Sequence, residues 1–325
     1  MGLIKKKRKD TTTGFLAVET ISLLYSLITA ILIISLFPRM DHPVQMLLER
    51  LAIAGVTIGL MLLGNKWKSK WMVLLRVAFQ MALLSYWYPD TYEFNRLFEN
   101  LDPLFASWEQ QLFGFQPAVE FSKYCGSLPL SEAFHLGYFS YYPMIGVVTL
   151  AYFFTRYKEF TKVAFILVGA FLLYYFLYIF IPVAGPQFYF PLIGWENVEA
   201  GVFPSIADAF KVYTGLEPGP GQSNGLFYHL VESAQAAGER PTAAFPSSHV
   251  GISTILLILS WRLSKGLFGF LVPFYMLLCG ATVYIQAHYA IDVLGGWISA
   301  FLIYGIVLLA YNALFKGDEN KKLYV

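Results

Sequence analysis

The sequence is poor in charged residues and in cysteine. Only 14% of its 325 residues are charged, against about 25% in a soluble domain, whereas 57% are hydrophobic and 18% aromatic. This composition, with its many long apolar runs, is typical of a polytopic membrane protein. Two cysteines, Cys125 and Cys279, are too few for a four-cysteine zinc site. The net charge of +2 gives no reason to expect a nucleic-acid partner.

Eight apolar runs can cross a membrane as helices. The first is too long for the core of a signal peptide, and no cleavage site follows it. We therefore predict an all-α fold, a polytopic bundle of about eight transmembrane helices with two long outer loops. The predicted spans are 15–37, 46–64, 71–88, 134–155, 163–181, 248–263, 267–287 and 293–315.

Two long polar intervals separate groups of spans. The first, 89–130, carries aromatic residues at near-helical spacing, which predicts one or two helices in the membrane interface or packed on the bundle. The second, 185–245, holds six prolines and many glycines. It predicts an irregular, ordered lid with short helical pieces at 204–213 and 225–237.

Lysine and arginine are unevenly divided between the two sides that these spans define. If the N-terminus is inside, 16 of the 23 fall in inside segments, beginning with the basic run 5–9. Six, Arg50 among them, are assigned to outside segments, and Arg76 lies within a span. Inside loops are normally the positive ones. The census therefore predicts cytoplasmic termini and places both long loops outside.

Residues 243–249, Ala-Ala-Phe-Pro-Ser-Ser-His, precede an apolar helix. Pro246 is typical of a helix start, and Ser247 is a natural N-cap. The first turn of such a helix offers unpaired N–H groups and the positive end of the helix dipole, which together bind anions. Ser248 adds a hydroxyl donor, and His249 stands in the same turn. The alternative is a plain capped helix with a histidine at the interface.

His288 and Asp292 lie four residues apart in 286–292, Gln-Ala-His-Tyr-Ala-Ile-Asp. On a helical turn they share a face, so the carboxylate can reach one ring nitrogen. That bond would fix the tautomer and leave the other nitrogen as nucleophile or base. A purely structural pair is the alternative. The number of spans between the two motifs puts both on the same, outer face.

The two motifs resemble those of the type 2 phosphatidic acid phosphatase superfamily. Its second motif, Pro-Ser-x-His, is matched by Pro246 to His249, and its third, His-x-x-x-Asp, by His288 to Asp292. Phe245, Tyr289 and the segment 181–189 are more similar to the inositol phosphorylceramide synthase branch of inositolphosphotransferases. The resemblance extends over residues 181–296.

This resemblance implies a lipid phosphatase or phosphotransferase that works through a phosphohistidine and needs no cofactor. In the implied scheme His288 is the nucleophile, Asp292 orients it, and His249 protonates the departing oxygen. The implied phosphate-binding residues are Arg240, Ser247 and Ser248, and the candidate substrate contacts are Gln187, Tyr189 and Gln286. Water, or a hydroxyl of a polyol such as inositol or of a lipid, would then take the phosphoryl group.

Several cations of the family are missing from this sequence. The positions concerned hold Gln187, Ser233, Thr282 and Gln286. Arg240 is then the main candidate for phosphate binding, with Lys211 second. A phosphodiester carries less charge than a phosphomonoester and needs fewer cations, which favours a transferase.

Other functions are open at this stage. A non-catalytic lipid-headgroup-binding or carrier protein could keep the same residues as a binding pocket. A serine hydrolase is disfavoured because Ser248 adjoins its histidine in sequence. A metal site of His249, His288 and Asp292 has no obvious further ligand. Haem is disfavoured because the histidines stand at helix ends.

The predicted organisation has four parts. A cytoplasmic basic tail occupies 1–14, N-terminal spans with an interfacial loop occupy 15–133, a catalytic membrane domain occupies 134–315, and a second cytoplasmic tail occupies 316–325. We expect the plasma (inner) membrane as the location, with the active site on its non-cytoplasmic face. The expected partners are the membrane, a lipid phosphate and a hydroxyl acceptor.

Overall fold

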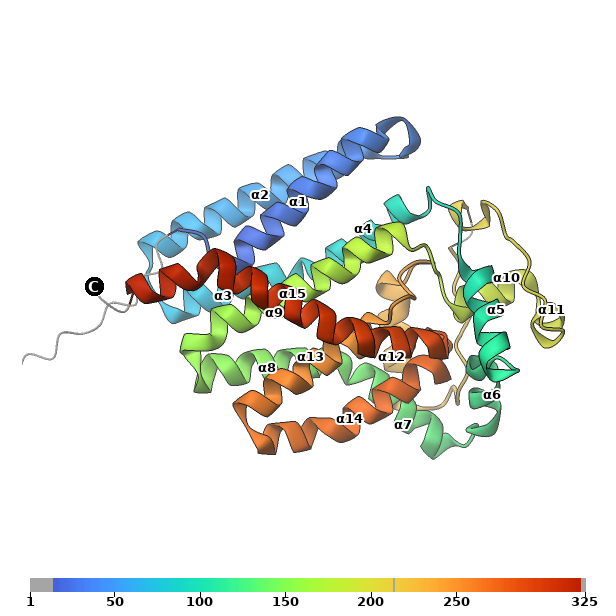
Figure 1. Ribbon diagram of the computed structural model, residues 1–325. Helices are drawn as coiled ribbons and strands as arrows, with labels where there is room; N and C mark the ends of the chain where they lie inside the picture. The colour runs from blue at the N-terminus through green and yellow to red at the C-terminus, as the bar shows by residue number, and fades with distance from the viewer. Residues whose placement is uncertain (1–13, 213, 323–325) are drawn as a thin grey trace, which may run out of the picture. The chain divides into compact units, whose positions relative to one another are not determined.

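The computed structural model describes residues 14–212 and 214–322, and the side chains as far as residue 315. Within these residues the secondary structure is helical throughout, without a strand (Figure 1). This confirms the predicted all-α class. The predicted basic tail lies outside the described residues except for Gly14.

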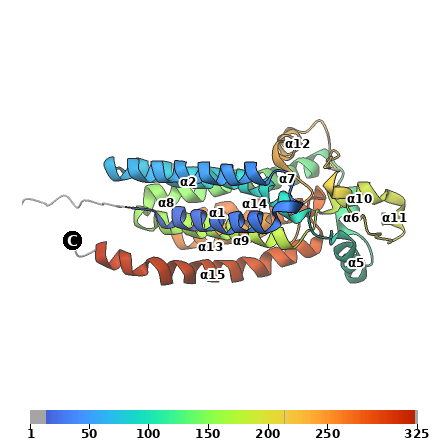
Figure 2. The same cartoon turned by 90° about the horizontal axis from the view of Figure 1, so that it is seen from above.

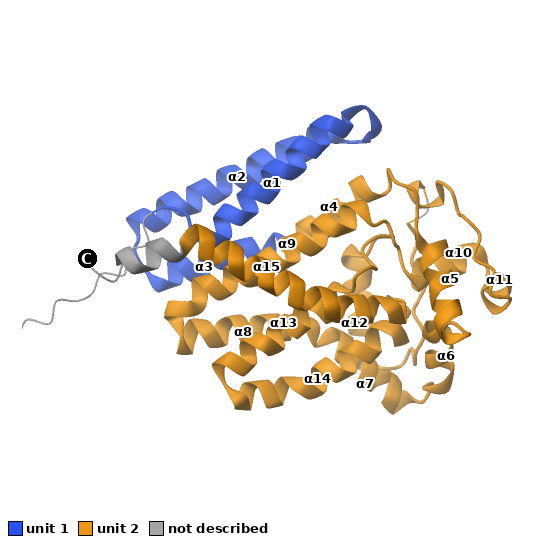
Figure 3. Ribbon diagram, in the orientation of Figure 1, with its two compact units in different colours: residues 1–83 blue, residues 84–325 orange. Residues whose placement is uncertain are grey.

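The chain forms two compact units, Met1–Leu83 and Leu84–Val325 (Figure 3). The first contains α1 (Ala17–Leu36), the 3-10 turn η1 (Phe37–Arg39), α2 (Pro43–Lys66) and α3 (Lys70–Ala82). The second contains α4 (Leu84–Asn95), α5 (Asp102–Phe113), α6 (Pro117–Tyr124), α7 (Leu128–Phe139), α8 (Tyr141–Thr155), α9 (Tyr157–Phe180), α10 (Pro186–Ile193), α11 (Trp195–Glu199), the 3-10 turn η2 (Ala209–Lys211), α12 (Leu226–Gly238), α13 (Ser248–Leu263), α14 (Lys265–Tyr284) and α15 (Ala290–Lys322).

Buried polar side chains join the helices of the first unit. Arg76 on α3 donates from Nε and Nη2 to the two carboxylate oxygens of Glu19 on α1, at 2.7 and 2.5 Å. Arg50, which the charge census assigned to an outside segment, is instead buried within α2 and donates to Thr29 at 3.1 Å. Arg50 therefore lies within a candidate span and not in a connecting segment, and a paired arginine can stay inside a helical bundle.

Helix α9 is the core of the second unit. Its sequence is apolar on all sides, and a helix of this kind is buried rather than amphipathic. It packs against α4, α8, α13 and α15, and Figure 1 shows it crossing the middle of the unit among them. Because α13 also contacts α8, α14 and α15, its N-terminus lies among several elements that can contribute side chains.

In the part of the chain that the structure describes, five helices are long and apolar enough to cross a membrane, namely α1, α2, α9, α14 and α15, and the apolar helices α8 and α13 are shorter. These helices indicate an integral membrane protein with a polytopic bundle. Two predicted spans are each divided between two helices, 71–88 between α3 and α4 and 134–155 between α7 and α8. The count of eight spans stays a prediction. Helix α15 continues to Lys322, past the predicted end of its span at residue 315.

Short helices gather at one end of the second unit (Figures 1 and 2). Helices α5 and α6 fall in the first polar interval, and α12 matches the helical piece predicted at 225–237. The piece predicted at 204–213 contains only η2, and Tyr213 lies outside the described residues. Helices α10 and α11 were not predicted. Pro186 occupies the first turn of α10, where proline is tolerated, although it suggested a loop in the sequence.

Candidate functional site

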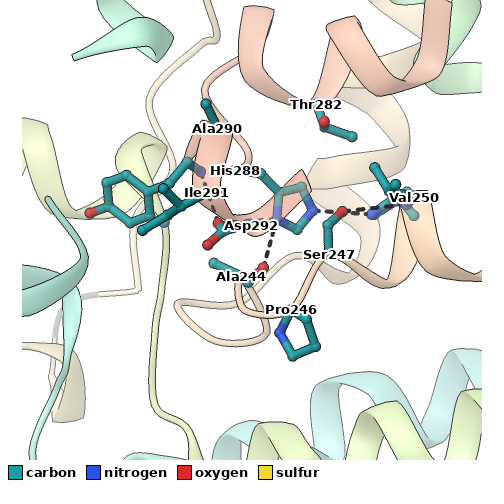
Figure 4. A network of polar contacts seen from close by, with 12 residues as sticks. Ala244, Pro246, Ser247, Val250, Thr282, His288, Ala290, Ile291 and Asp292 are labelled. Atoms are coloured by element: carbon teal, nitrogen blue, oxygen red, sulfur yellow. Dashed lines mark hydrogen bonds and ion pairs between the residues drawn. The ribbon is translucent and has the colours of Figure 1, made fainter. Parts of the chain in front are cut away.

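The two histidine motifs meet within the second unit (Figure 4). Residues 243–247 lead into α13, and residues 285–289 connect α14 to α15. A third segment, around Gly185, joins them through the hydrogen bond from Gln187 N to Gln286 O at 2.9 Å. Each segment has one residue with positive φ: Ala243 at 71°, Gly185 at 95° and Gln286 at 63°. Such backbone strain in non-glycine residues is concentrated at functional sites.

The imidazole of His288 is held by the backbone. Its Nδ1 lies 2.8 Å from the carbonyl oxygen of Ala244. Because a carbonyl only accepts, Nδ1 carries the hydrogen and the neutral ring keeps a lone pair at Nε2. Nε2 faces Nδ1 of His249 at 3.4 Å. The geometry thus leaves a lone pair on the ring nitrogen that a nucleophile needs.

Asp292 lies behind the same ring. Its Oδ2 is 3.5 Å from Nδ1 of His288 and accepts a hydrogen bond from Tyr289 N at 2.8 Å. Its Oδ1 is buried and has no hydrogen-bond partner among the described residues. The sequence predicted a carboxylate–imidazole bond, but the closest acceptor to Nδ1 is the carbonyl of Ala244. Burial of Asp292 disfavours its charged form, whereas a positive ring at 3.5 Å would favour the ionised carboxylate and be stabilised by it.

His249 stands in the first turn of α13, against aromatic side chains of α7 and α8. Its ring is stacked on Tyr138, with the centroids 4.7 Å apart and 29° between the planes, and packs against Tyr141 at 4.5 Å. Because Nε2 of His288 carries no hydrogen, His249 must donate from Nδ1 in the contact between them. Packing on two rings therefore fixes the orientation of a second proton carrier.

The start of α13 is less open than its sequence suggested. Ser247 is the N-cap, and its hydroxyl accepts from Val250 N at 3.4 Å. The amide of Ser247 donates to Asp292 O at 3.1 Å, and the amide of Ser248 donates to Tyr178 Oη at 3.0 Å. Three amides of the predicted anion cradle thus have partners within the protein.

The two candidate cations have different environments. Arg240 is half-buried, and its Nη1 donates to the carbonyl of Glu239 at 2.9 Å. Lys211 forms an ion pair with Asp208 at 2.7 Å, and both side chains are exposed. Glu239, the residue before Arg240, lies near enough to Arg240 and to the ring of His288 for their charged forms to lower the pKa of its carboxyl. Arg240 therefore shares an acidic neighbour with His288, whereas Lys211 is paired with Asp208 at the surface.

The three predicted substrate contacts are almost inaccessible. Gln187 and Gln286 are buried, and Gln187 Oε1 accepts from Gln235 Nε2 of α12 at 3.0 Å. Tyr189 is fully buried, and its hydroxyl donates to Pro204 O at 2.7 Å, which ties α10 to the loop beyond it. In this closed arrangement Tyr189 packs within the protein core, whereas Gln286 lies in the segment that carries His288 and its carbonyl oxygen accepts from Gln187 N.

Sequence reasoning missed several residues that contact the site. Tyr178 of α9 bridges the first histidine motif, because its hydroxyl donates to Pro246 O at 2.9 Å and accepts from Ser248 N. Glu239 accepts from Tyr88 Oη at 2.6 Å. Asp102 and Glu109 of α5 bind the segment around His288. Only the acidic residues gave a signal, since carboxylates are rare in so apolar a sequence.

Burial controls the protonation of the groups outside the apolar helices. It lowers the pKa of His288 to about 4, although the bond to Ala244 and the charge of Glu239 oppose this. His288 is therefore neutral at physiological pH. Burial raises the pKa of the Glu239 carboxyl, and the hydrogen bond from Tyr88 opposes the rise. No cluster of three His, Cys, Asp or Glu residues that could hold a metal ion occurs among the described residues.

Comparison with known proteins identifies the family. No curated protein and no solved structure matches the chain. A family model described as the PAP2 superfamily matches residues 106–306, a stretch that contains both histidine motifs and Arg240. Since this stretch is more than half of the 325 residues, the chain belongs to the PAP2 superfamily.

Proposed function

We propose that the chain transfers a phosphoryl group from a lipid-linked phosphate through a phosphohistidine at His288. Membership in the PAP2 superfamily supports a membrane enzyme of the phosphatase or phosphotransferase type. The observation that carries the proposal is the contact of Nε2 of His288 with His249 at 3.4 Å, while Nδ1 is held by Ala244 at 2.8 Å. This arrangement supports a nucleophile next to a proton donor.

In the first half-reaction the lone pair of His288 Nε2 attacks phosphorus, and the bond from phosphorus to the lipid oxygen breaks. His249, as imidazolium, gives a proton to the departing oxygen and becomes neutral. The ring of His288 becomes positive, and the carboxylate of Asp292 at 3.5 Å stabilises that charge. An incoming phosphoryl group has to separate the two rings, which now face each other directly.

In the second half-reaction a hydroxyl group attacks the phosphohistidine, and His249 takes its proton. Water makes the enzyme a phosphatase, whereas an alcohol makes it a transferase. The resemblance to inositolphosphotransferases favours a polyol such as inositol as the acceptor. Neutral Gln187 and Gln286, with Arg240 as the associated cation, support a substrate of low charge such as a phosphodiester.

The remaining roles follow from position. Arg240 and the hydroxyl of Ser248 bind the phosphoryl oxygens, and Ser247 shapes the helix start as its N-cap. We place the reaction at the non-cytoplasmic face of the plasma membrane, where both long loops are predicted to lie. The short helices that gather at one end of the second unit, such as α5, α6, α10 and α11, would then cover the headgroup of the lipid.

Purified protein incubated with radiolabelled lipid phosphates, with and without myo-inositol, tests the proposal. Free phosphate identifies a phosphatase, and a labelled acceptor identifies a transferase. We expect wild-type protein to carry acid-labile, base-stable phosphate, and H288A to carry none and to lose turnover. H229A, which removes an exposed histidine of α12, is the matched control. Full turnover by H288A would reject the mechanism.

A non-catalytic headgroup-binding protein is the second candidate, because the described site is closed and three amides of the α13 start are already bonded. In that case H288A would bind the lipid as well as wild type does, and neither protein would release or transfer phosphate. Lipid binding and turnover should therefore be measured on the same preparations.

A further inference from the structure

Helix α5 carries two fully buried carboxylates, Asp102 and Glu109, which the proposed reaction does not use. They are seven positions apart, which is about two helical turns, so both lie on one face of the helix. Burying a carboxylate is costly unless hydrogen bonds replace its water. The partners of these two side chains therefore show what α5 is built to hold.

Asp102 binds two segments of the site at once. Its Oδ2 accepts from Ala184 N at 2.7 Å and from Asn100 Nδ2 at 2.6 Å. Its Oδ1 accepts from Gly185 N at 2.8 Å and from Tyr289 Oη at 3.0 Å. Each carboxylate oxygen thus has two donors, which only an ionised carboxylate can accommodate in full. Asp102 ties the segment before α10 to the residue that follows His288.

Glu109 binds the next two residues. Its Oε1 accepts from Ala290 N at 2.5 Å and from Ile291 N at 3.3 Å, while Tyr289 N donates to Asp292. Three successive amides after His288 are therefore held by two carboxylates. This satisfies the N–H groups that the start of α15 would otherwise leave unpaired. Figure 4 shows how close Ala290 and Ile291 lie to His288 and Asp292.

We propose that Asp102 and Glu109 are positioning residues of the phosphoryl site, which hold the loop carrying His288 so that Nε2 meets phosphorus in line. The inference rests on the proposed function for its kinetic consequence, although the clamp itself is a matter of geometry. A displacement of about 1 Å at a reacting atom costs about 100-fold in rate. The two residues differ in charge state, which makes the proposal testable.

Two titratable groups from outside α5 act on Glu109, namely Asp292 of α15 and the Tyr289 hydroxyl. Asp102 is on the same helix as Glu109. The Oε2 atom of Glu109 and Oδ1 of Asp292 are buried without hydrogen-bond partners among the described residues. Burial, and then the charge of Asp292, raise the pKa of Glu109 to about 8. At neutral pH Glu109 is therefore protonated, and a glutamine is its close mimic.

The kinetic test compares E109Q, E109A and D102N with wild type. E109A loses the acceptor for two amides, and we expect kcat to fall by about 100-fold with little change in KM. E109Q should recover most of the wild-type kcat at pH 7. D102N places a side-chain amide, whose NH2 group cannot accept a hydrogen bond, among four donors. Its kcat should fall as much as that of E109A. E99Q, a charge-removing change at exposed Glu99, is the control.

The pH profile separates positioning from plain stability. In wild type we expect kcat to change through a transition near the pKa of Glu109, about 8. E109Q should lack that transition, whereas E99Q should keep it. Equal losses in E109Q and E109A at pH 7, or the same alkaline transition in E109Q and wild type, would overturn the proposal.

A second measurement does not depend on turnover. The chain has five histidines, so the ring signal of His288 can be assigned in ¹³C-histidine NMR spectra by its loss in H288A. We expect this signal to shift near pH 8 in wild type and to stay constant in E109Q. If the proposed reaction is wrong, turnover is absent but this shift remains. If the clamp is wrong, the shift is absent or survives in E109Q.

Discussion

Nδ1 of His288 donates to the carbonyl oxygen of Ala244 over 2.8 Å, while Oδ2 of Asp292 lies 3.5 Å from the same nitrogen. The shorter contact is a full hydrogen bond and fixes the tautomer, whereas the longer one is beyond the usual range. In the proposed reaction Asp292 therefore acts on the positive ring of His288 through charge rather than through a hydrogen bond. Tautomer selection and charge stabilisation would then be divided between a backbone carbonyl and a carboxylate.

This division predicts a moderate effect of D292N. In a triad whose carboxylate also selects the tautomer, the change from Asp to Asn costs about 10⁴-fold in kcat. Here Ala244 still selects the tautomer, so we expect a loss of about 100-fold in kcat from the missing charge. Steady-state turnover of the lipid phosphate measures this loss, and ¹⁵N-histidine spectra should show hydrogen on Nδ1 in both proteins. Hydrogen on Nε2 in D292N would contradict the assignment.

Acid should destabilise the fold through His288. Its folded-state pKa, about 4, lies below the ordinary value of 6.5, so between these values the unfolded chain binds a proton that the folded chain does not. Stability from the neutral ring is complete above about pH 6.5 and is lost as pH falls towards 4. The slope is at most about 1.4 kcal/mol per pH unit.

The comparison of wild type with H288Q isolates this effect. Glutamine does not titrate, so H288Q should lose less stability than wild type between about pH 6.5 and 4. Thermal unfolding in detergent at several pH values measures the difference, and H229Q is the matched control at an exposed position. Parallel curves for wild type and H288Q would show that burial does not control the ionisation of His288.

The sequence contained enough to predict the helical class, the pairing of the two histidine motifs and α12. Apolar runs and the spacing of His288 and Asp292 are local patterns, and local patterns can be read directly. Short helices within the loops were harder to predict. Pro186 and Pro191 are as compatible with a break in the helix pattern as with the short helix α10, which contains both.

Long-range partners could not be predicted. The acceptor for His288 is a backbone carbonyl 44 positions away, and a backbone carbonyl has no signature in the sequence. Glu109 reaches Ala290 over 181 positions, and Arg76 reaches Glu19 over 57. Such pairs arise only when helices pack, so the carboxylates were visible in the sequence but their roles were not.

Gly185 should be intolerant of a side chain. A Cβ at this position would lie 2.7 Å from the carbonyl oxygen of Ala287, the residue before His288, and the residue has φ of 95°. We expect G185A to lower stability by about 2–4 kcal/mol, because a backbone with φ 95° and ψ 165° costs a non-glycine residue about 1–3 kcal/mol and the contact adds to it. G194A is the matched control, since Gly194 has φ of 84° and nothing within 4 Å of the added Cβ.

The two alanine variants should differ in turnover as well as in stability. Only G185A pushes on the backbone next to His288, so kcat should fall in G185A and stay close to wild type in G194A. Thermal unfolding and turnover on the same preparations decide this. Equal losses in both variants would mean that positive φ alone, rather than the contact with Ala287, limits this position.

Arg240 should act on substrate binding rather than on the chemical step. A charge-assisted hydrogen bond contributes about 1.5–3 kcal/mol, so R240A should raise KM for the lipid phosphate by about 10- to 100-fold. R240K should recover part of the loss, because lysine keeps the charge without the bidentate geometry. K211A removes one positive charge from the same loop, where Lys211 pairs with Asp208 at the surface, and should leave KM near the wild-type value. Equal effects of R240A and K211A would indicate that both residues only attract the anionic lipid in a general way. A residue other than Arg240 would then have to bind the phosphate in the site.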